Sequence, residues 1–206
     1  MVAESAGSSS ANVGVLALQG AFAAHVEALR RCGVDAFEVR TAEQLERCDA
    51  LVIPGGESTT MLKLLATFEL VDPLAKLLDG GLPTFGTCAS RIMPAREVSD
   101  GRDDQISFDA IDLDVRRNGY GRQVDSFEAD LTVGAIGEPP LRAVFIRAPV
   151  VERVGADVEV LASVDRGDGP VPVLCRQGPV LVSSFHPELV DDDRLHRYFI
   201  DQLLTA

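Results

Sequence analysis

One cysteine stands in a setting that suits a nucleophile. Cys88 follows Leu82–Gly86, a segment that predicts a buried strand, and the residues around it predict a tight turn from that strand into a helix. Such a turn lifts the sulfur clear of the sheet and places it at a helix N-terminus, where the helix dipole favours the thiolate. A free cysteine is equally common as a buried core residue, and we expect that role for the other three cysteines.

A histidine and a carboxylate follow a later apolar segment. His186 and Glu188 are two residues apart, so in an extended chain both side chains project to the same face. The carboxylate can then orient the imidazole, and the imidazole can take the proton of a thiol, as in acyl-transfer triads. Taken alone, His186 is better interpreted as an incidental histidine at the end of a surface strand. His25 and His196 lack such a partner spacing, and we expect no chemical role for them.

Two adjacent glycines follow a third apolar segment. Gly55 and Gly56 let the backbone approach a substrate closely and turn an N–H toward it. The N–H groups of Gly56 and Ala89 are therefore the predicted donors of an oxyanion hole. Each such donor stabilises a transition state by about 3–4 kcal/mol. The segment lacks the Lys-Ser/Thr ending of a phosphate-binding loop, which argues against a nucleotide site.

The elements that must position these groups alternate between strand and helix. Apolar runs at Val13–Leu18, Ala50–Ile53, Leu82–Gly86 and Val180–Phe185 predict strands buried on both faces, and helical patterns lie between the early ones. This order is typical of an α/β fold, a three-layer αβα sandwich with a mostly parallel central sheet. Alternating stretches between Ile106 and Leu131 predict an antiparallel extension. The carboxyl ends of parallel strands are where ligands gather.

Length and composition restrict the class of protein. The chain has 206 residues, and we expect residues 1–12 to be a disordered lead-in and residues 13–206 a single domain. The net charge of −13 argues against nucleic acid and anionic membranes as partners. The four cysteines show no C-x-x-C spacing, so we expect neither a disulfide scaffold nor a metal site, and a cytoplasmic location.

The three segments together resemble the triad, or class I, glutamine amidotransferases, which combine a G-x-C turn, a P-G-G motif and a late H-P-E. The stretches VGVLALQGAFAAHVEAL, LVIPGGESTTM, RRNGYGRQVDSFEADL, FIRAPVVERV and SFHPEL are similar, more specifically, to the glutaminase subunits of pyridoxal 5′-phosphate synthase. The likeness extends over nearly the whole chain from Val13.

The resemblance implies a role for each group. Cys88 would be the nucleophile, His186 the general base and acid, and Glu188 the orienting carboxylate in hydrolysis of L-glutamine to L-glutamate and ammonia. No cofactor is implied. The residues implied to bind glutamine are Gly55, Gly56, Glu57, Arg117, Ile146 and Arg147.

A partner is implied in the same way. The ammonia would pass to a synthase subunit that builds pyridoxal 5′-phosphate, and the glutaminase would be weak until docked there. Gln19 and Gly20 match the loop associated with that coupling.

The chain departs from the family after the nucleophile. The family continues G-T-C-A-G with apolar residues, whereas this chain has Ser90, Arg91 and Pro94 in that stretch. A proline in a helix interior costs about 3 kcal/mol, so we expect a kinked or shortened helix and an oxyanion amide that is displaced.

Three alternatives therefore stay open. The first is a weakly active or silent subunit that serves assembly, the second is a class I amidotransferase that feeds another acceptor, and the third is a cysteine hydrolase or chaperone of related fold. In the third class the histidine usually follows the cysteine closely, unlike His186 here.

Overall fold

The computed structural model describes residues 11–88, 94–99, 107–116, 126–167 and 169–204. The expected disordered lead-in, apart from its last two residues, lies outside these ranges, and strand β1 begins at Asn12. No helix in the described ranges is both long and apolar enough to cross a membrane.

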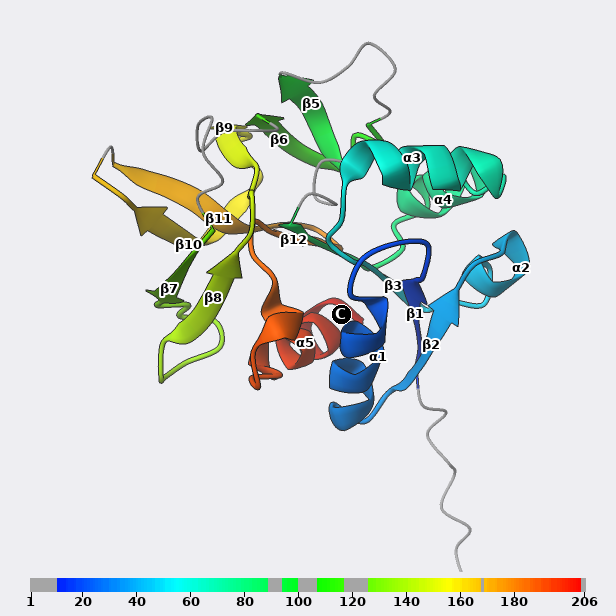
Figure 1. The fold of residues 1–206 in the computed structure, drawn as a ribbon, viewed down its shortest axis with the longest axis horizontal. Coiled ribbons are helices and arrows are strands. Elements are labelled where there is room, and N and C mark those ends of the chain that lie inside the picture. The colour runs from blue at the N-terminus through cyan, green and yellow to red at the C-terminus, as the bar shows by residue number, and fades with distance from the viewer. Residues whose placement is uncertain (1–10, 89–93, 100–106, 117–125, 168, 205–206) are drawn as a thin grey trace, which may run out of the picture.

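A seven-stranded sheet forms the centre of the molecule (Figure 1). Its strand order is β10-β11-β12-β4-β3-β1-β2, in which the five strands from β12 to β2 are parallel and β10 and β11 extend the sheet antiparallel. Their bounds are β1 Asn12–Leu16, β2 Asp35–Val39, β3 Ala50–Ile53, β4 Thr84–Thr87, β10 Glu159–Asp165, β11 Pro170–Gln177 and β12 Val180–Ser183.

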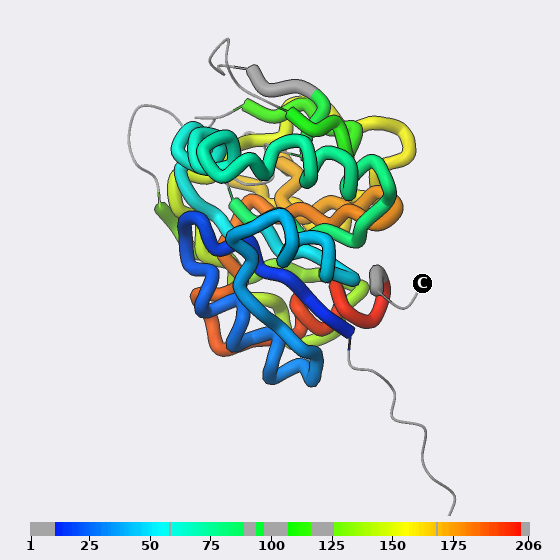
Figure 2. Tube along the Cα trace, turned by 90° about the vertical axis from the view of Figure 1, so that its right-hand side faces the viewer, coloured from blue at the N-terminus to red at the C-terminus, as the bar shows by residue number. Residues whose placement is uncertain are grey.

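Helices cover both faces of this sheet (Figures 1 and 2). The helices α1 and α5 pack on one face, and α2, α3 and α4 belong to the apolar core on the other. Their bounds are α1 Phe22–Arg31, α2 Ala42–Leu45, α3 Ser58–Thr67, α4 Val71–Asp79 and α5 Arg194–Phe199, after which the π-helical turn η3 runs from Ile200 to Leu204. The predicted three-layer αβα fold with an antiparallel extension is thus confirmed.

Two small sheets complete the fold. The strands β5 (Ala95–Ser99), β6 (Ile111–Arg116) and β9 (Val150–Val154) form one, and the strands β7 (Phe127–Leu131) and β8 (Leu141–Phe145) form an antiparallel pair. The first shares an apolar cluster with β11 and β12, and the second packs into the same core as α1 and α5. The alternating stretches predicted strands in the region of β6 and β7, but neither β5 nor β9 was expected from the apolar pattern. Strand β6 pairs antiparallel with β9 and parallel with β5.

Local sequence signals explain where several helices begin and end. The side chain of Glu57 caps α3 by accepting hydrogen bonds from the N–H groups of Thr59 and Thr60, at 3.0 and 2.8 Å. Thr41 begins α2 with a capping box. Helix α1 ends just before Gly33, whose φ of +92° is a conformation that glycine adopts without strain.

The topology brings the three chemically interesting segments to one edge. Strand β4 lies between β12 and β3, and all three run parallel. Cys88 follows β4, Gly55 follows β3, and His186 follows β12. Residues that are distant in the chain therefore leave the sheet as neighbours.

Candidate active site

Cys88 stands at a strained turn directly after β4. Its φ is +51°, a left-handed conformation that is costly for a residue with a side chain and that occurs at functional sites. The residue is 4% exposed, and its Sγ lies 3.6 Å from the carbonyl oxygen of Ile146. This backbone is what the sequence predicted for a nucleophile elbow.

The imidazole of His186 meets the thiol across Gly55. A Cβ placed on Gly55 would lie 2.6 Å from Cε1 of His186 and 2.8 Å from Cβ of Cys88, so only a glycine leaves both side chains room. The segment is held in place by the N–H of His186, which donates to the carbonyl oxygen of Val144 in β8 at 2.9 Å.

Glu188 holds the other side of the ring. Its Oε1 lies 2.8 Å from Nδ1 of His186, and its side chain is fully buried, whereas that of His186 is 13% exposed. The residue belongs to the short 3-10 turn η2, Pro187–Leu189, rather than to an extended strand. The predicted proximity of the two groups is therefore right, although the backbone that creates it is a turn.

The contacts between these groups set their charges. Burial lowers the pKa of His186, but hydrogen bonds with Cys88 and Glu188 raise it by more, to about 10. Burial likewise raises the pKa of Glu188, but hydrogen bonds with His186 and His25 outweigh it and hold that pKa well below its usual range. An imidazolium between a carboxylate and a thiol is the arrangement that stabilises a thiolate nucleophile.

The other cysteines lack such surroundings. None of the four cysteines takes part in a disulfide. Burial raises the pKa of Cys32, and it raises the pKa of Cys48 to about 11, so both thiols stay protonated at neutral pH. Cys175 is fully buried in the apolar cluster beneath β6 and β9. The expectation of structural roles for these three agrees with their positions.

The glycine loop faces the same site. The N–H of Gly55 donates to Oγ1 of Thr87 at 2.9 Å, so of the two glycine N–H groups that of Gly56 stays the candidate for an oxyanion donor. A Cβ on Gly56 would lie 3.0 Å from Nε2 of Gln19, and one on Gly20 would overlap the carbonyl oxygen of Gly55. The Gln19-Gly20 loop is thus packed on the loop that forms the site.

The remaining residues implied to bind glutamine fall into three groups. Glu57 is exposed and caps α3; burial raises its pKa, but hydrogen bonds from Thr60 and Thr59 lower it to about 2, so the carboxylate is ionised and held in place. Ile146 contacts Cys88, and Arg147 follows it with a left-handed φ of +46°. Arg117 and the oxyanion candidate Ala89 lie outside the described residues.

The altered stretch after the nucleophile is described only at its end. Ser90 and Arg91 lie outside the described residues, so the kinked or shortened helix stays a prediction. Pro94 lies in a turn and Ala95 begins β5, so neither residue is helical.

The expectation that His25 and His196 have no role near the chemical groups is wrong, because both adjoin this site. His25 and His196 are both fully buried, and Nε2 of His25 lies 3.3 Å from Oε2 of Glu188. A signal was available, because each histidine shares the apolar face of its helix, His25 with Phe22 and Leu29, and His196 with Phe199. A polar residue on a buried helix face requires a hydrogen-bond partner, so this pattern indicates that each histidine has one.

Comparison with known proteins places the chain in a family. Residues 15–205 match the model of the SNO glutamine amidotransferase family. The chain is 53% identical to the pyridoxal 5′-phosphate synthase subunit PdxT of Pelotomaculum thermopropionicum, with 94% of this chain and 96% of that one covered. It is 55% identical to the subunit of the same name from Rhodococcus jostii, with 92% and 95% covered.

A solved structure agrees with this result. A crystal structure of a glutamine amidotransferase superimposes with a TM-score of 0.84 at 51% identity, covering 94% of this chain and 99% of that one. The chain therefore belongs to the SNO glutamine amidotransferase family.

Proposed function

We propose that this protein is the glutaminase subunit of a pyridoxal 5′-phosphate synthase, and that Cys88, His186 and Glu188 hydrolyse L-glutamine in it. The observation that carries the proposal is the meeting of thiol, imidazole and carboxylate at the ends of β4 and β12, in a chain of this family. The relatives at 53% and 55% identity are subunits of that synthase by name.

The reaction begins with attack on the side-chain amide of glutamine. The Cys88 sulfur bonds to the amide carbon, and the electron pair of the carbonyl moves to the oxygen, where the N–H groups of Gly56 and Ala89 would receive it. The tetrahedral intermediate collapses as the C–N bond breaks, and His186 gives its proton to the departing ammonia. A glutamyl thioester remains on Cys88.

Hydrolysis of the thioester completes the cycle. His186, now neutral, takes a proton from water as the water oxygen bonds to the thioester carbon. The C–S bond then breaks, which releases glutamate and returns the thiolate beside the imidazolium. Throughout, Glu188 fixes the ring through Nδ1, so that Nε2 faces the reacting atoms.

The substrate is placed by groups around Cys88. We assign Gly55, Gly56, Glu57, Ile146 and Arg147 to the glutamine site, together with Arg117. Glu57 suits the α-ammonium group, because its carboxylate is ionised and held by the N-terminus of α3. A guanidinium such as that of Arg117 can bind both oxygens of the α-carboxylate.

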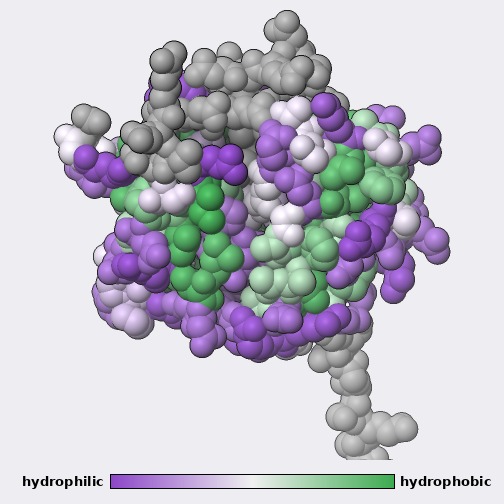
Figure 3. Space-filling model, viewed as in Figure 1, coloured by the Kyte–Doolittle hydropathy of each residue, from purple (hydrophilic) through white to green (hydrophobic). Residues whose placement is uncertain are grey.

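The proposal includes docking to a synthase subunit in the cytoplasm. Leu189, directly after the triad carboxylate, is 49% exposed. Figure 3 shows apolar residues in two groups on one face, with hydrophilic residues around them. An apolar centre with a polar rim is typical of protein interfaces. The Gln19-Gly20 loop packs on Gly55 and Gly56, so a partner that contacts this loop would affect the site directly.

Ammonia release from glutamine, with and without the synthase subunit, tests the proposal. We expect release that depends on Cys88 and increases when the partner is added. Release that is equal in Cys88→Ala, or absent from the assembled complex, would contradict the proposal.

A silent assembly subunit is the second candidate, and the altered residues Ser90, Arg91 and Pro94 favour it. Treatment of the assembled complex with the glutamine-like electrophile diazo-oxo-norleucine separates the two. An active site labels Cys88, whereas a silent subunit leaves it unlabelled. An amidotransferase that serves another acceptor would release ammonia without stimulation by the synthase.

A further inference from the structure

Two buried histidines lie behind the triad carboxylate. His25 comes from α1 and His196 from α5, and both are fully buried. Nδ1 of His25 lies 2.9 Å from Nε2 of His196, and the two ring centroids are 5.2 Å apart. Apolar residues of the core, including Phe85 and Phe199, surround this pair. A polar pair in such a place is costly unless its hydrogen bonds are made.

The histidine pair reaches the oxygen of Glu188 that the triad does not use. Oε1 of Glu188 lies 2.8 Å from His186, and Oε2 lies 3.3 Å from Nε2 of His25. This approach is an ion-pair distance, and no well-aligned hydrogen bond reaches Oε2 from any described residue. A fully buried carboxylate with one oxygen unpaired would be strongly disfavoured in its ionised form. His25 is therefore the group that makes an ionised Glu188 tolerable.

The protons on this line of groups can be assigned. Burial and the neighbouring His25 lower the pKa of His196 to about 3, so His196 is neutral near pH 7. An ionised carboxylate only accepts protons from its neighbours, so the 3.3 Å approach of Glu188 places a proton on Nε2 of His25. The 2.9 Å contact between the two rings is then satisfied when Nε2 of His196 donates to Nδ1 of His25.

The remaining contacts agree with this assignment. Nδ1 of His196, which would carry no proton, has no hydrogen-bond partner among the described residues. Oγ1 of Thr87 lies 3.5 Å from Nε2 of His25 and accepts from the N–H of Gly55. The charged groups that act on His196 are His25, Glu188, Asp193 and Arg31, of which the last two are paired with each other at the surface.

We infer that His25 is a positioning residue for Glu188, oriented in turn by His196. The structure assigns it the second N–H that holds the carboxylate ionised and immobile, so that Glu188 can orient His186 and stabilise its protonated form. The described polar contacts of His25 are with Glu188, His196 and Thr87, and none is with Cys88, so His25 acts on the nucleophile indirectly. This role rests on the proposed triad and adds to it.

The test measures the reactivity of Cys88 with iodoacetamide as a function of pH, which requires neither glutamine nor the synthase. Replacement of His25 by Phe keeps the bulk and removes the donor. We expect the alkylation rate of His25→Phe at pH 6.5 to fall by about tenfold or more, because a weaker Glu188 gives a smaller population of thiolate beside imidazolium. Reactivity would then appear only at higher pH.

The choice of replacement distinguishes a specific donor from mere bulk. Gln places an amide N–H₂ near the position of Nε2, whereas Asn is too short to reach Glu188. We expect His25→Gln to stay within about threefold of the original protein and His25→Asn to behave like His25→Phe. If His25→Phe does not fold, the Gln and Asn variants alone provide the test. Equal alkylation rates of Cys88 in these two variants overturn the proposal.

A control in the same helix measures the effect of stability. Val26→Ala removes a buried side chain next to His25 without touching the histidines. We expect it to lower the melting temperature and leave the pH profile unchanged. An unchanged profile in His25→Phe, or losses that follow melting temperature across all variants, overturns the proposal. If His186→Ala also leaves the profile unchanged, the triad itself fails, which is a different result.

Discussion

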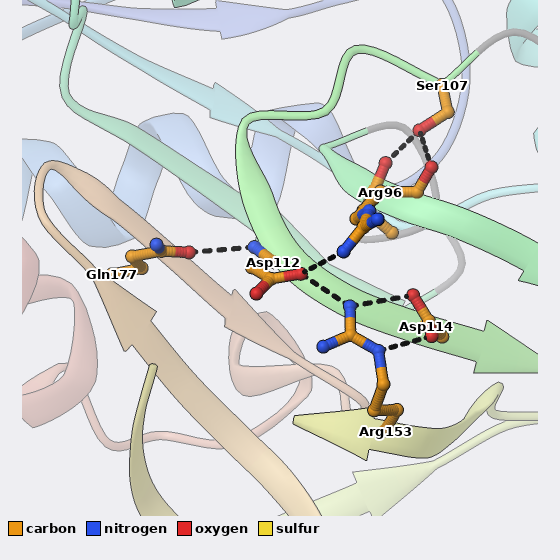
Figure 4. A network of polar contacts seen from close by, with 7 residues as sticks. Arg96, Ser107, Asp112, Asp114, Arg153 and Gln177 are labelled. Carbon is orange, nitrogen blue, oxygen red and sulfur yellow. Dashed lines mark hydrogen bonds and ion pairs between the residues drawn. The ribbon is translucent and has the colours of Figure 1, made fainter. Parts of the chain in front are cut away.

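Two polar networks in this molecule contain similar numbers of groups, but one is buried and the other is partly exposed to solvent. The line from Cys88 through His186 and Glu188 to His25 is almost entirely buried. The network on β6 and β9 joins Arg153 to Asp112 and Asp114, with side chains 23–38% exposed (Figure 4). Water screens the second network and cannot screen the first.

The exposed network is nevertheless geometrically complete. Arg153 lies between the two carboxylates and bonds to Asp114 through Nε and Nη2, at 2.5 and 3.0 Å. Arg96 adds a contact of 3.3 Å to Asp112, whose N–H donates to Gln177 at 2.7 Å. The hydrogen bonds to these carboxylates raise the pKa of Arg153 above its ordinary value. The comparison teaches that burial, more than contact geometry, decides how much a polar network contributes.

Removal of the sulfur tests the buried network most severely. We expect Cys88→Ala to lower ammonia release from glutamine by at least about 10⁴-fold, because no other described thiol adjoins the imidazole. The variant should fold normally, since alanine fits a buried position. Ammonia assays in the presence of the synthase measure the effect. Residual activity near that of the original protein would show that the nucleophile is elsewhere.

Neutralising the carboxylate is expected to have the next largest effect. In Glu188→Gln a neutral amide replaces the carboxylate. The amide orients the ring of His186 less well and no longer stabilises its protonated form. We expect kcat to fall by about 10²–10⁴-fold with KM little changed. The pKa of His186, measured by NMR, should fall from about 10 toward its ordinary value. A proportional rise in KM instead would place Glu188 in substrate binding.

A single methyl group on Gly55 should disturb the site by crowding. The added Cβ would overlap both His186 and Cys88, at 2.6 and 2.8 Å, so one of them must move. We expect Gly55→Ala to reduce kcat by about 10²-fold, the effect of a displacement of roughly 1 Å. Gly134→Ala is the matched control, since nothing lies within 4 Å of its Cβ. Equal activities of the two variants would contradict the tight geometry.

Acid should reveal the buried histidine pair through stability. His196 has a folded pKa of about 3 and an ordinary pKa of about 6.5, so below pH 6.5 the unfolded chain binds more protons than the folded one. Its contribution to stability is therefore present above pH 6.5 and is lost as the pH falls toward 3. In His196→Phe we expect the slope of unfolding free energy between pH 6.5 and 5 to decrease by up to about 1.4 kcal/mol per pH unit.

Urea unfolding at several pH values checks this expectation. The carboxyl group of Glu188 does not complicate the window, because its stabilising ionisation is lost only below its ordinary pKa of about 4.3. Val26→Ala, in the same core, should shift the whole curve and leave its slope unchanged. An identical slope in His196→Phe would mean that His196 does not stay neutral in the folded state.

The exposed network should show the smallest effect. We expect Arg153→Met to change the melting temperature by no more than about 2 °C, with glutaminase activity unchanged, because solvent screens the ion pairs. Addition of about 0.5 M salt shortens the Debye length to a few Å and should reduce even this difference in melting temperature. A large loss of stability would show that the network on β6 and β9 is more than a surface feature.

The sequence by itself determined the architecture of the central sheet and the identity of the main chemical groups. Uninterrupted apolar runs such as Ala50–Ile53 predicted strands buried on both faces, and their carboxyl ends placed Gly55, Cys88 and His186 at one edge. Short strands with charged residues, such as β5 and β9, escaped prediction because their stability comes from pairing with β6 rather than from an apolar pattern.

Only the tertiary structure decided how the carboxylate is held. His25 and His196 are separated by 171 residues, and no local pattern relates them to Glu188. Their contact depends on how α1 and α5 pack together on the same face of the sheet. Hydrogen bonds of this kind are set by packing distances, whereas the order of strands and the turn at the nucleophile follow from the polarity and shape of neighbouring residues. This is why the proximity of His186 and Glu188 could be predicted and the contact of Glu188 with His25 could not.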